Sequence, residues 1–145
     1  MKHLHEITNV AVGIANATIL ADNTPAAVDL AGYRGAEIIL AIGAGGITFT
    51  TTNKVEFKLT HSDDDSTYTA VAQSEVLGTT VGTGGIIKSL NAAHATASVY
   101  RVGYVGSKRY LKLLADFSGT HGTGTPIAAI VVRGYPGHSP APDQV

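Results

Sequence analysis

Residues 54–72 read KVEFKLTHSDDDSTYTAVA and contain the pattern that decides the fold. In its first part, the apolar side chains of Val55, Phe57 and Leu59 alternate with polar ones, which places them on one face of a β-strand. Residues 62–66 are Ser and Asp, whose side chains hydrogen-bond to the backbone of tight turns. The stretch therefore predicts a half-exposed antiparallel strand, a hairpin turn and a returning strand.

Short runs of the same kind on both sides extend the β pattern over the whole chain. Residues 37–42 (EIILAI) form a continuous apolar run, which indicates a strand buried on both faces, or one that faces the core and a partner. No long helix is expected, and a single helical turn is predicted at residues 88–94. The other strands are expected within residues 7–20, 27–30, 67–72, 98–105, 109–117 and 126–133.

These strands predict an all-β protein, a single antiparallel β-sandwich or jelly-roll-like barrel with extended N- and C-terminal segments. The length of 145 residues fits one domain. Residues 1–10 are expected to be an N-terminal arm, residues 11–135 the sandwich, and residues 136–145 a Pro-rich tail that is disordered by itself. Gly- and Thr-rich loops at 43–53 and 119–125 are expected at one end of the sandwich.

Composition excludes several classes of protein. The chain has 10 Lys and Arg against 11 Asp and Glu, a net charge of −1, whereas nucleic-acid binders are normally basic. It has no cysteine, so a disulfide framework and cysteine-ligated zinc are excluded. No apolar run approaches the roughly 18–20 residues of a membrane span, and the polar N-terminus predicts no secretion signal. We therefore expect neither a nucleic-acid nor a membrane partner.

Candidate metal and catalytic sites are incomplete. On a strand, His3 and His5 would share a face and could chelate a metal, but no third ligand is near in sequence. Asp63 to Asp65 resemble a calcium loop, yet the twelfth loop position is Ser74 in place of Glu. A Ser–His pair lies in the Pro-rich tail, and the carboxylates are scattered. The sequence predicts no enzyme, no cofactor and no metal site.

Two stretches carry a resemblance to a known class of protein. Residues 55–68 (VEFKLTHSDDDSTY) and residues 98–136, with GYVG followed by KRYLKL, a Gly/Thr loop and an apolar strand, resemble small virion proteins of tailed bacteriophages. The resemblance covers about half of the chain and implies a head decoration (cement) protein. Such a protein is made in the host cytoplasm, binds the outside of the capsid and stabilises contacts between major capsid subunits.

The resemblance also implies a homo-oligomer, with three copies around a capsid threefold axis as the expected stoichiometry. The N-terminal arm is predicted to add a strand to a neighbouring subunit. The Pro-rich tail is predicted to lose little conformational entropy when it binds, because proline is already restricted. Arg34, Lys108 and Arg109 are predicted to pair with carboxylates of the capsid. The predicted contact residues are His3, His5, Arg34, Lys108, Arg109, Pro136, Pro140 and Pro142.

Two alternatives stay open. The chain could be a tail or head–tail connector component that uses the same sandwich in a ring. It could also be a surface-displayed carbohydrate-binding module, because six tyrosines are available for sugar stacking, although there is no tryptophan. Core packing is the simpler explanation of the tyrosines.

Overall fold

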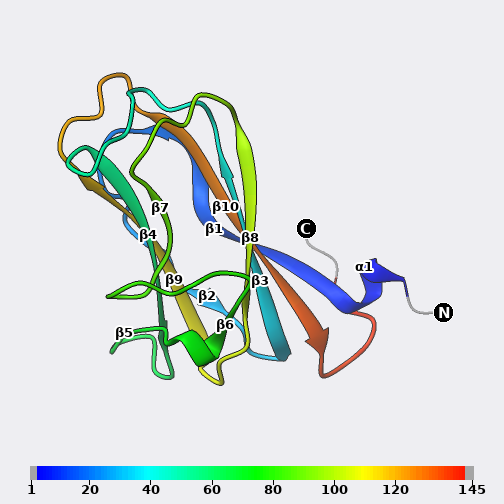
Figure 1. Ribbon diagram of the computed structural model, residues 1–145. Coiled ribbons are helices and arrows are strands. Elements are labelled where there is room, and N and C mark those ends of the chain that lie inside the picture. Colours follow the sequence, from blue (N-terminus) through cyan, green and yellow to red (C-terminus); the bar gives the residue numbers. More distant parts are fainter. Residues whose placement is uncertain (1–2, 143–145) are drawn as a thin grey trace.

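Strands dominate the computed structural model, which describes residues 3–142 (Figure 1). With 51% strand and 5% helix in two packed antiparallel sheets, it confirms the predicted all-β sandwich. Within the described residues, no helix is long and apolar enough to cross a membrane. The elements are α1 (Leu4–Ile7), β1 (Thr8–Ile19), β2 (Val28–Asp29), β3 (Tyr33–Ile42), β4 (Lys54–Ser62), β5 (Thr69–Ala70), the 3₁₀ helix η1 (Gln73–Glu75), β6 (Val76–Leu77), β7 (Ile86–Leu90), β8 (Ser98–Tyr104), β9 (Tyr110–Ser118) and β10 (Thr125–Pro136).

Both sheets pair strands that are far apart in the sequence. Sheet A has the order β1-β10-β3-β8-β6, so the two ends of the chain pair at one edge. Sheet B has the order β2-β9-β4-β5, and β7 also pairs with β4. β3 is central in sheet A, where Ile39 lies opposite Ile130 on one side and Arg101 on the other.

The core between the sheets is made of alternate residues, as the strand periodicity predicts. Val55, Phe57 and Leu59 of β4 point inward and are buried. They face inward side chains of sheet A such as Ile38 and Leu40 of β3, which are also buried. Residues 37–42 thus have one core face, and their other face lies on the outside of sheet A.

The turn after β4 has the structure expected from its sequence. Asp64 accepts hydrogen bonds from the backbone N–H groups of Ser66 (2.9 Å) and Thr67 (2.8 Å) and from the Ser62 hydroxyl (2.7 Å). These donors stabilise the ionised carboxylate and lower the pKa of Asp64 to about 2. The return strand β5 is shorter than expected.

The predicted helical turn at residues 88–94 is wrong. Residues 88–90 are the end of β7, in which Leu90 lies opposite Val55 of β4, and residues 91–94 follow this strand. Ile87 and Leu90 are both buried, so pairing with β4 combines backbone hydrogen bonds with apolar burial. Tertiary pairing overrides the helix propensity of the alanines that follow.

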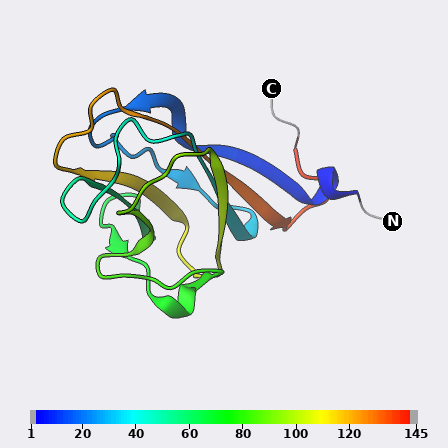
Figure 2. The ribbon, with the colours of Figure 1, turned by 45° about the horizontal axis from the view of Figure 1, so that its top comes forward.

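Both ends of the chain are more ordered than their sequences indicated. Thr8 to Val10 of the predicted arm begin β1 and pair with β10 of the same chain. In the tail, the Ala141 N–H donates to the Glu6 carbonyl (2.8 Å), so the expectation of disorder is wrong for residues 136–142. Residues 1–2 and 143–145 lie outside the described residues. Figures 1 and 2 show the ends of β1 and β10 projecting beyond the sandwich, with α1 at the tip.

Candidate protein-interaction surfaces

The outer face of sheet A is apolar over most of its extent. Antiparallel pairing places its outward side chains in rows that run across the strands. The middle row consists of Val12, Ile130, Ile39 and Arg101. The row toward the projecting arm consists of Val10, Val132, Glu37, Gly103 and Leu77. The row on the other side of the middle row consists of Ala128, Ala41 and Val99. We call these residues the sheet-A face.

Several of these apolar side chains are largely accessible to solvent. Val99 is 68% exposed, Val12 is 61% exposed and Leu77 is 58% exposed. The face carries one carboxylate and one guanidinium, and these pair with each other, because Arg101 Nε lies 3.5 Å from Glu37 Oε1. The sheet-A face is therefore both apolar and electrically neutral.

The outer face of sheet B is built differently. Its strands present charged side chains in pairs, with Lys54 Nζ 2.6 Å from Glu56 Oε1 and Lys58 bonded to Asp116. Lys112 lies over the Tyr68 ring at 4.1 Å. One outer face is thus adapted to water and the other is not. An exposed, contiguous apolar face of this kind marks a site of protein contact in soluble proteins.

Two hollows extend the sheet-A face at its ends. The hollow near the arm has a volume of about 400 Å³ and is lined by exposed Leu4, Val105 and Tyr135 together with Leu77. The other, of about 290 Å³, lies beside Ala41, Ala128 and Val99. The apolar surface therefore continues from α1 to the far end of β10 and is not flat.

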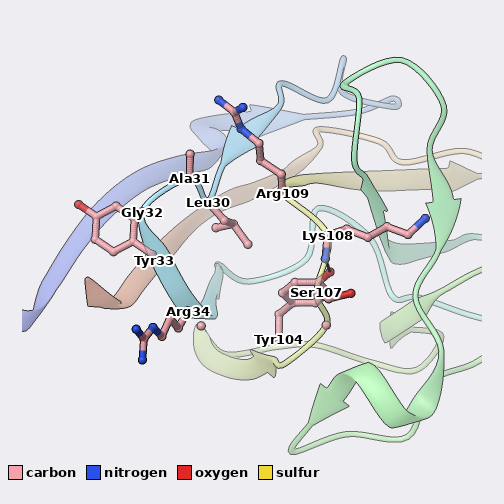
Figure 3. Close-up of a pocket in the computed structure, with 11 residues that line it drawn as sticks. Leu30, Ala31, Gly32, Tyr33, Arg34, Tyr104, Ser107, Lys108 and Arg109 are labelled. Carbon is pink, nitrogen blue, oxygen red and sulfur yellow. Dashed lines mark hydrogen bonds between the residues drawn. The ribbon is translucent and has the colours of Figure 1, made fainter. Parts of the chain in front are cut away.

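A third hollow gathers the predicted basic residues. Arg34 at the start of β3 and Lys108 and Arg109 between β8 and β9 all line a pocket of about 450 Å³ (Figure 3). Sequence analysis grouped these three as capsid contacts, and the structure brings them together. Leu30 and Tyr104 lie between them, so the pocket is apolar inside and basic at its rim.

The three cations do not converge on one point. Figure 3 shows their side chains turned away from one another. Arg109 makes two 2.8 Å bonds to the Asp29 carboxylate, which lower the pKa of that carboxyl. Lys108 Nζ lies 3.3 Å from Thr69 Oγ1 and 3.9 Å from Asp63 Oδ2, while Arg34 has no ion pair within residues 3–142. Arg34 is the cation of the rim that is available to an external carboxylate.

A buried hydrogen-bond network holds the loop beside this pocket. The Tyr104 hydroxyl lies 2.8 Å from His61 Nδ1 and accepts the Lys108 N–H at 3.3 Å. On its other side, His61 Nε2 lies 3.6 Å from the Glu75 carboxylate. Burial lowers the pKa of His61 and raises the pKa of Tyr104 to about 12, so the neutral forms of both are favoured. The network joins β4, β8 and the loop before β9.

The remaining predicted contact residues lie near the projecting arm. His3 precedes α1 and His5 lies within it, so the pair is not on a strand and does not share a face. Pro136 ends β10 opposite Tyr33, Pro140 follows a cis peptide bond, and the Pro142 carbonyl accepts from Asn9 Nδ2 (2.8 Å). No group of three potential metal ligands occurs in the described part of the chain.

The two glycine-rich loops lie together at one end of the sandwich, as predicted, and the connection between β8 and β9 lies at the other end (Figure 1). Gly46 packs so closely on the Gly124 carbonyl that a Cβ there would overlap it. Phe49 of one loop and His121 of the other are both buried, with their ring centroids 6.1 Å apart. These loops are therefore closed against each other.

The tyrosines do not form an exposed stacking platform. Tyr104 is buried, and four of the remaining rings have a cation over one face. The covered rings are those of Tyr33, Tyr68, Tyr100 and Tyr110. Tyr135 is the exposed one and belongs to the hollow near the arm.

Sequence reasoning did not identify the sheet-A face as a site. The signal was present in the apolar run at 37–42, for which a partner-facing side was one interpretation. Comparisons with known protein families, curated proteins and solved structures found no match.

Proposed function

We propose that this chain is a non-enzymatic structural protein of a tailed-phage particle, and specifically a capsid decoration protein. In this role it binds the outside of the head and stabilises contacts between major capsid subunits. The proposal combines the resemblance of residues 55–68 and 98–136 with one structural observation. That observation is the sheet-A face, an exposed apolar surface on a rigid sandwich.

An apolar, neutral face suits a protein partner better than a sugar or a nucleic acid. Sugars are recognised through exposed aromatic rings, and the face holds none among its rows. Nucleic acids require a basic surface, whereas Glu37 and Arg101 cancel each other here. Burying Val, Ile and Leu side chains against another subunit supplies a non-directional driving force.

The basic pocket supplies the second part of the proposal. Arg34 is placed to pair with a capsid carboxylate, as sequence analysis proposed for all three basic residues. Lys108 and Arg109 contribute less, because they already contact Thr69 and Asp29. A rim charge of this kind changes the rate and salt dependence of binding more than its affinity.

A tail or head–tail connector component is the second candidate, because the same apolar face would serve in a ring. Copy number separates the two: a decoration protein occurs in hundreds of copies on a particle and a ring component in few. The homotrimer expected from the resemblance stays a prediction.

The proposal is tested by adding the purified chain to capsid shells stripped of their decoration. Saturable binding of many copies, with a higher melting temperature of the shells, supports it. The variant Arg34→Gln should weaken binding several-fold at low salt and little at high salt, whereas Lys54→Gln on sheet B is the matched control. A chain that leaves the shells unbound and their melting unchanged would falsify the decoration role.

A further inference from the structure

We propose that protonation of the buried His61 releases the loop between β8 and β9, residues 105–109, so that this part of the basic pocket is ordered at neutral pH and opens in acid. The switch is a property of the free chain and does not depend on the proposed capsid partner. It is carried by the sparse anchoring of the loop, by the bond between that anchor and His61, and by the position of the Lys108 charge.

The β8–β9 loop is held in its middle by a single backbone hydrogen bond. Both of its end residues make backbone hydrogen bonds of 2.8 Å to neighbouring segments. Within the described part of the chain, residues 106–108 have one backbone hydrogen bond, from the Lys108 N–H to the Tyr104 hydroxyl oxygen at 3.3 Å (Figure 3). Gly106 lies against the same oxygen, because a Cβ there would be 2.4 Å from it. A segment with so few backbone hydrogen bonds can open without unfolding the sheets.

The hydrogen bonds of Tyr104 assign the protons of neutral His61. The Tyr104 oxygen accepts the Lys108 N–H, so its own hydrogen is free to donate to His61 Nδ1, 2.8 Å away. No other acceptor bonds this hydroxyl among the described residues. Nδ1 is therefore the acceptor, and the ring hydrogen lies on Nε2, which is 3.6 Å from the Glu75 carboxylate.

A proton that His61 takes from solvent must bind at Nδ1, the ring nitrogen without a hydrogen. The Nδ1–H, the Lys108 N–H and the hydroxyl hydrogen of Tyr104 then converge on one oxygen atom. The hydroxyl hydrogen has lost its acceptor, and Gly106 lies too close to the oxygen for a water molecule to enter between them. The charged ring is the stronger donor, so the bond from Lys108 is the one that weakens.

The charges around His61 favour the same outcome. Burial lowers the pKa of His61; the Glu75 carboxylate opposes this effect, the Lys108 ammonium adds to it, and the Asp63 carboxylate opposes it. β8 contributes the Tyr104 hydroxyl, and the residues opposite His61 on β5 and β9 are uncharged. Movement of Lys108 away from the imidazolium relieves the repulsion between two cations, while Glu75 remains beside it. The fold therefore accommodates the new charge by opening this loop.

Hydrogen exchange followed by NMR tests the inference on the complete chain. Chemical shifts of the His61 ring give its titration, and exchange rates in the same samples give the protection factor of the Lys108 amide. As His61 titrates between about pH 7 and about pH 4.5, this protection factor should fall roughly tenfold, which corresponds to the loss of one hydrogen bond. The amide of Phe57, in β4 between β9 and β7, should keep its protection.

Two variants and a control separate His61 from other titrating groups. His61→Gln keeps an acceptor for the Tyr104 hydroxyl but takes up no proton, so Lys108 should be equally protected at both pH values. Tyr104→Phe removes the acceptor, so the Lys108 amide should be unprotected at both. His94→Gln is the matched control and should behave like wild type, because His94 bonds the Gly43 carbonyl in the glycine-rich loops. Circular dichroism establishes that each variant is folded.

Four results would overturn the inference. They are a His61 ring still neutral at about pH 4.5, Lys108 protection that stays constant while His61 titrates, the wild-type fall persisting in His61→Gln, or Phe57 losing protection together with Lys108. The shell-binding experiment is made at neutral pH and is independent of these. A chain with the switch that ignores capsid shells overturns the decoration role alone, and a chain without the switch that saturates the shells overturns this inference alone.

Discussion

Tyr104→Phe removes one oxygen atom from the buried network that joins β4, β8 and the loop before β9. Two groups lose their partner, the Nδ1 atom of His61 and the backbone N–H of Lys108. Leaving a buried polar group without a hydrogen bond costs about 1–3 kcal/mol, so we expect a loss of roughly 2–4 kcal/mol in the free energy of unfolding. At about 3 °C per kcal/mol for a domain of this size, the melting temperature should fall by roughly 6–12 °C.

Urea denaturation at pH 7, followed by circular dichroism, measures this loss, and calorimetry gives the shift in melting temperature. Tyr33→Phe is the matched control: no hydrogen bond involves the Tyr33 hydroxyl in the described structure, and its ring keeps the contact with Arg133. The control should change the stability by less than about 0.5 kcal/mol. If Tyr104→Phe behaves like Tyr33→Phe, the network adds nothing to stability, and its assignment as the anchor of this loop is wrong.

Three further predictions concern the folded domain. Burial lowers the pKa of His61, so as the pH falls this histidine is protonated in the unfolded chain before it is protonated in the folded chain. The free energy of unfolding should therefore fall as the pH drops below about 6.5. An NMR titration that places the pKa of His61 in the folded chain above 6.5 would refute its assignment as a buried, neutral side chain. Asp64→Ala should lower the urea midpoint at pH 7, and its difference from wild type should shrink as the pH falls from about 4 through about 2, where the folded-state carboxyl becomes protonated; a difference that is as large at pH 2 as at pH 7 would contradict the turn assignment. Ile38→Ala, at a position that is 0% exposed, should cost about 2–5 kcal/mol in the free energy of unfolding; a stability loss below 1 kcal/mol would show that the core is not packed as described.

The local features of the fold were predictable because they depend on near neighbours in the chain. The two-residue period of β4 and β9 places alternate side chains on one face wherever the strand is later placed. The turn at residues 62–66 likewise follows from Asp64, whose carboxylate reaches backbone groups two and three residues away. The extent of β1 and the strand β7 were not predictable, because they depend on pairing with β10 and β4.

The surfaces needed the tertiary structure. That Arg34 lines the same pocket as Lys108 and Arg109 follows from how β3 and the loop before β9 come together at one end of the sandwich. That Arg109 is already bound follows from Asp29, which is 80 residues away in sequence. A charge count cannot separate a satisfied cation from an available one.

By itself, the sequence indicated an all-β sandwich or jelly-roll-like barrel with alternating strands, a net charge of −1 and a continuous apolar run at residues 37–42. Only the tertiary structure decided that β1, β10, β3 and β8 lie side by side in a register that collects Val12, Ile130 and Ile39 in one outward row. The physical reason is that alternation along a strand is a local property of the backbone. Strand order and register, in contrast, depend on contacts between residues far apart in the sequence, from 62 positions for Ile39 and Arg101 to 118 for Val12 and Ile130.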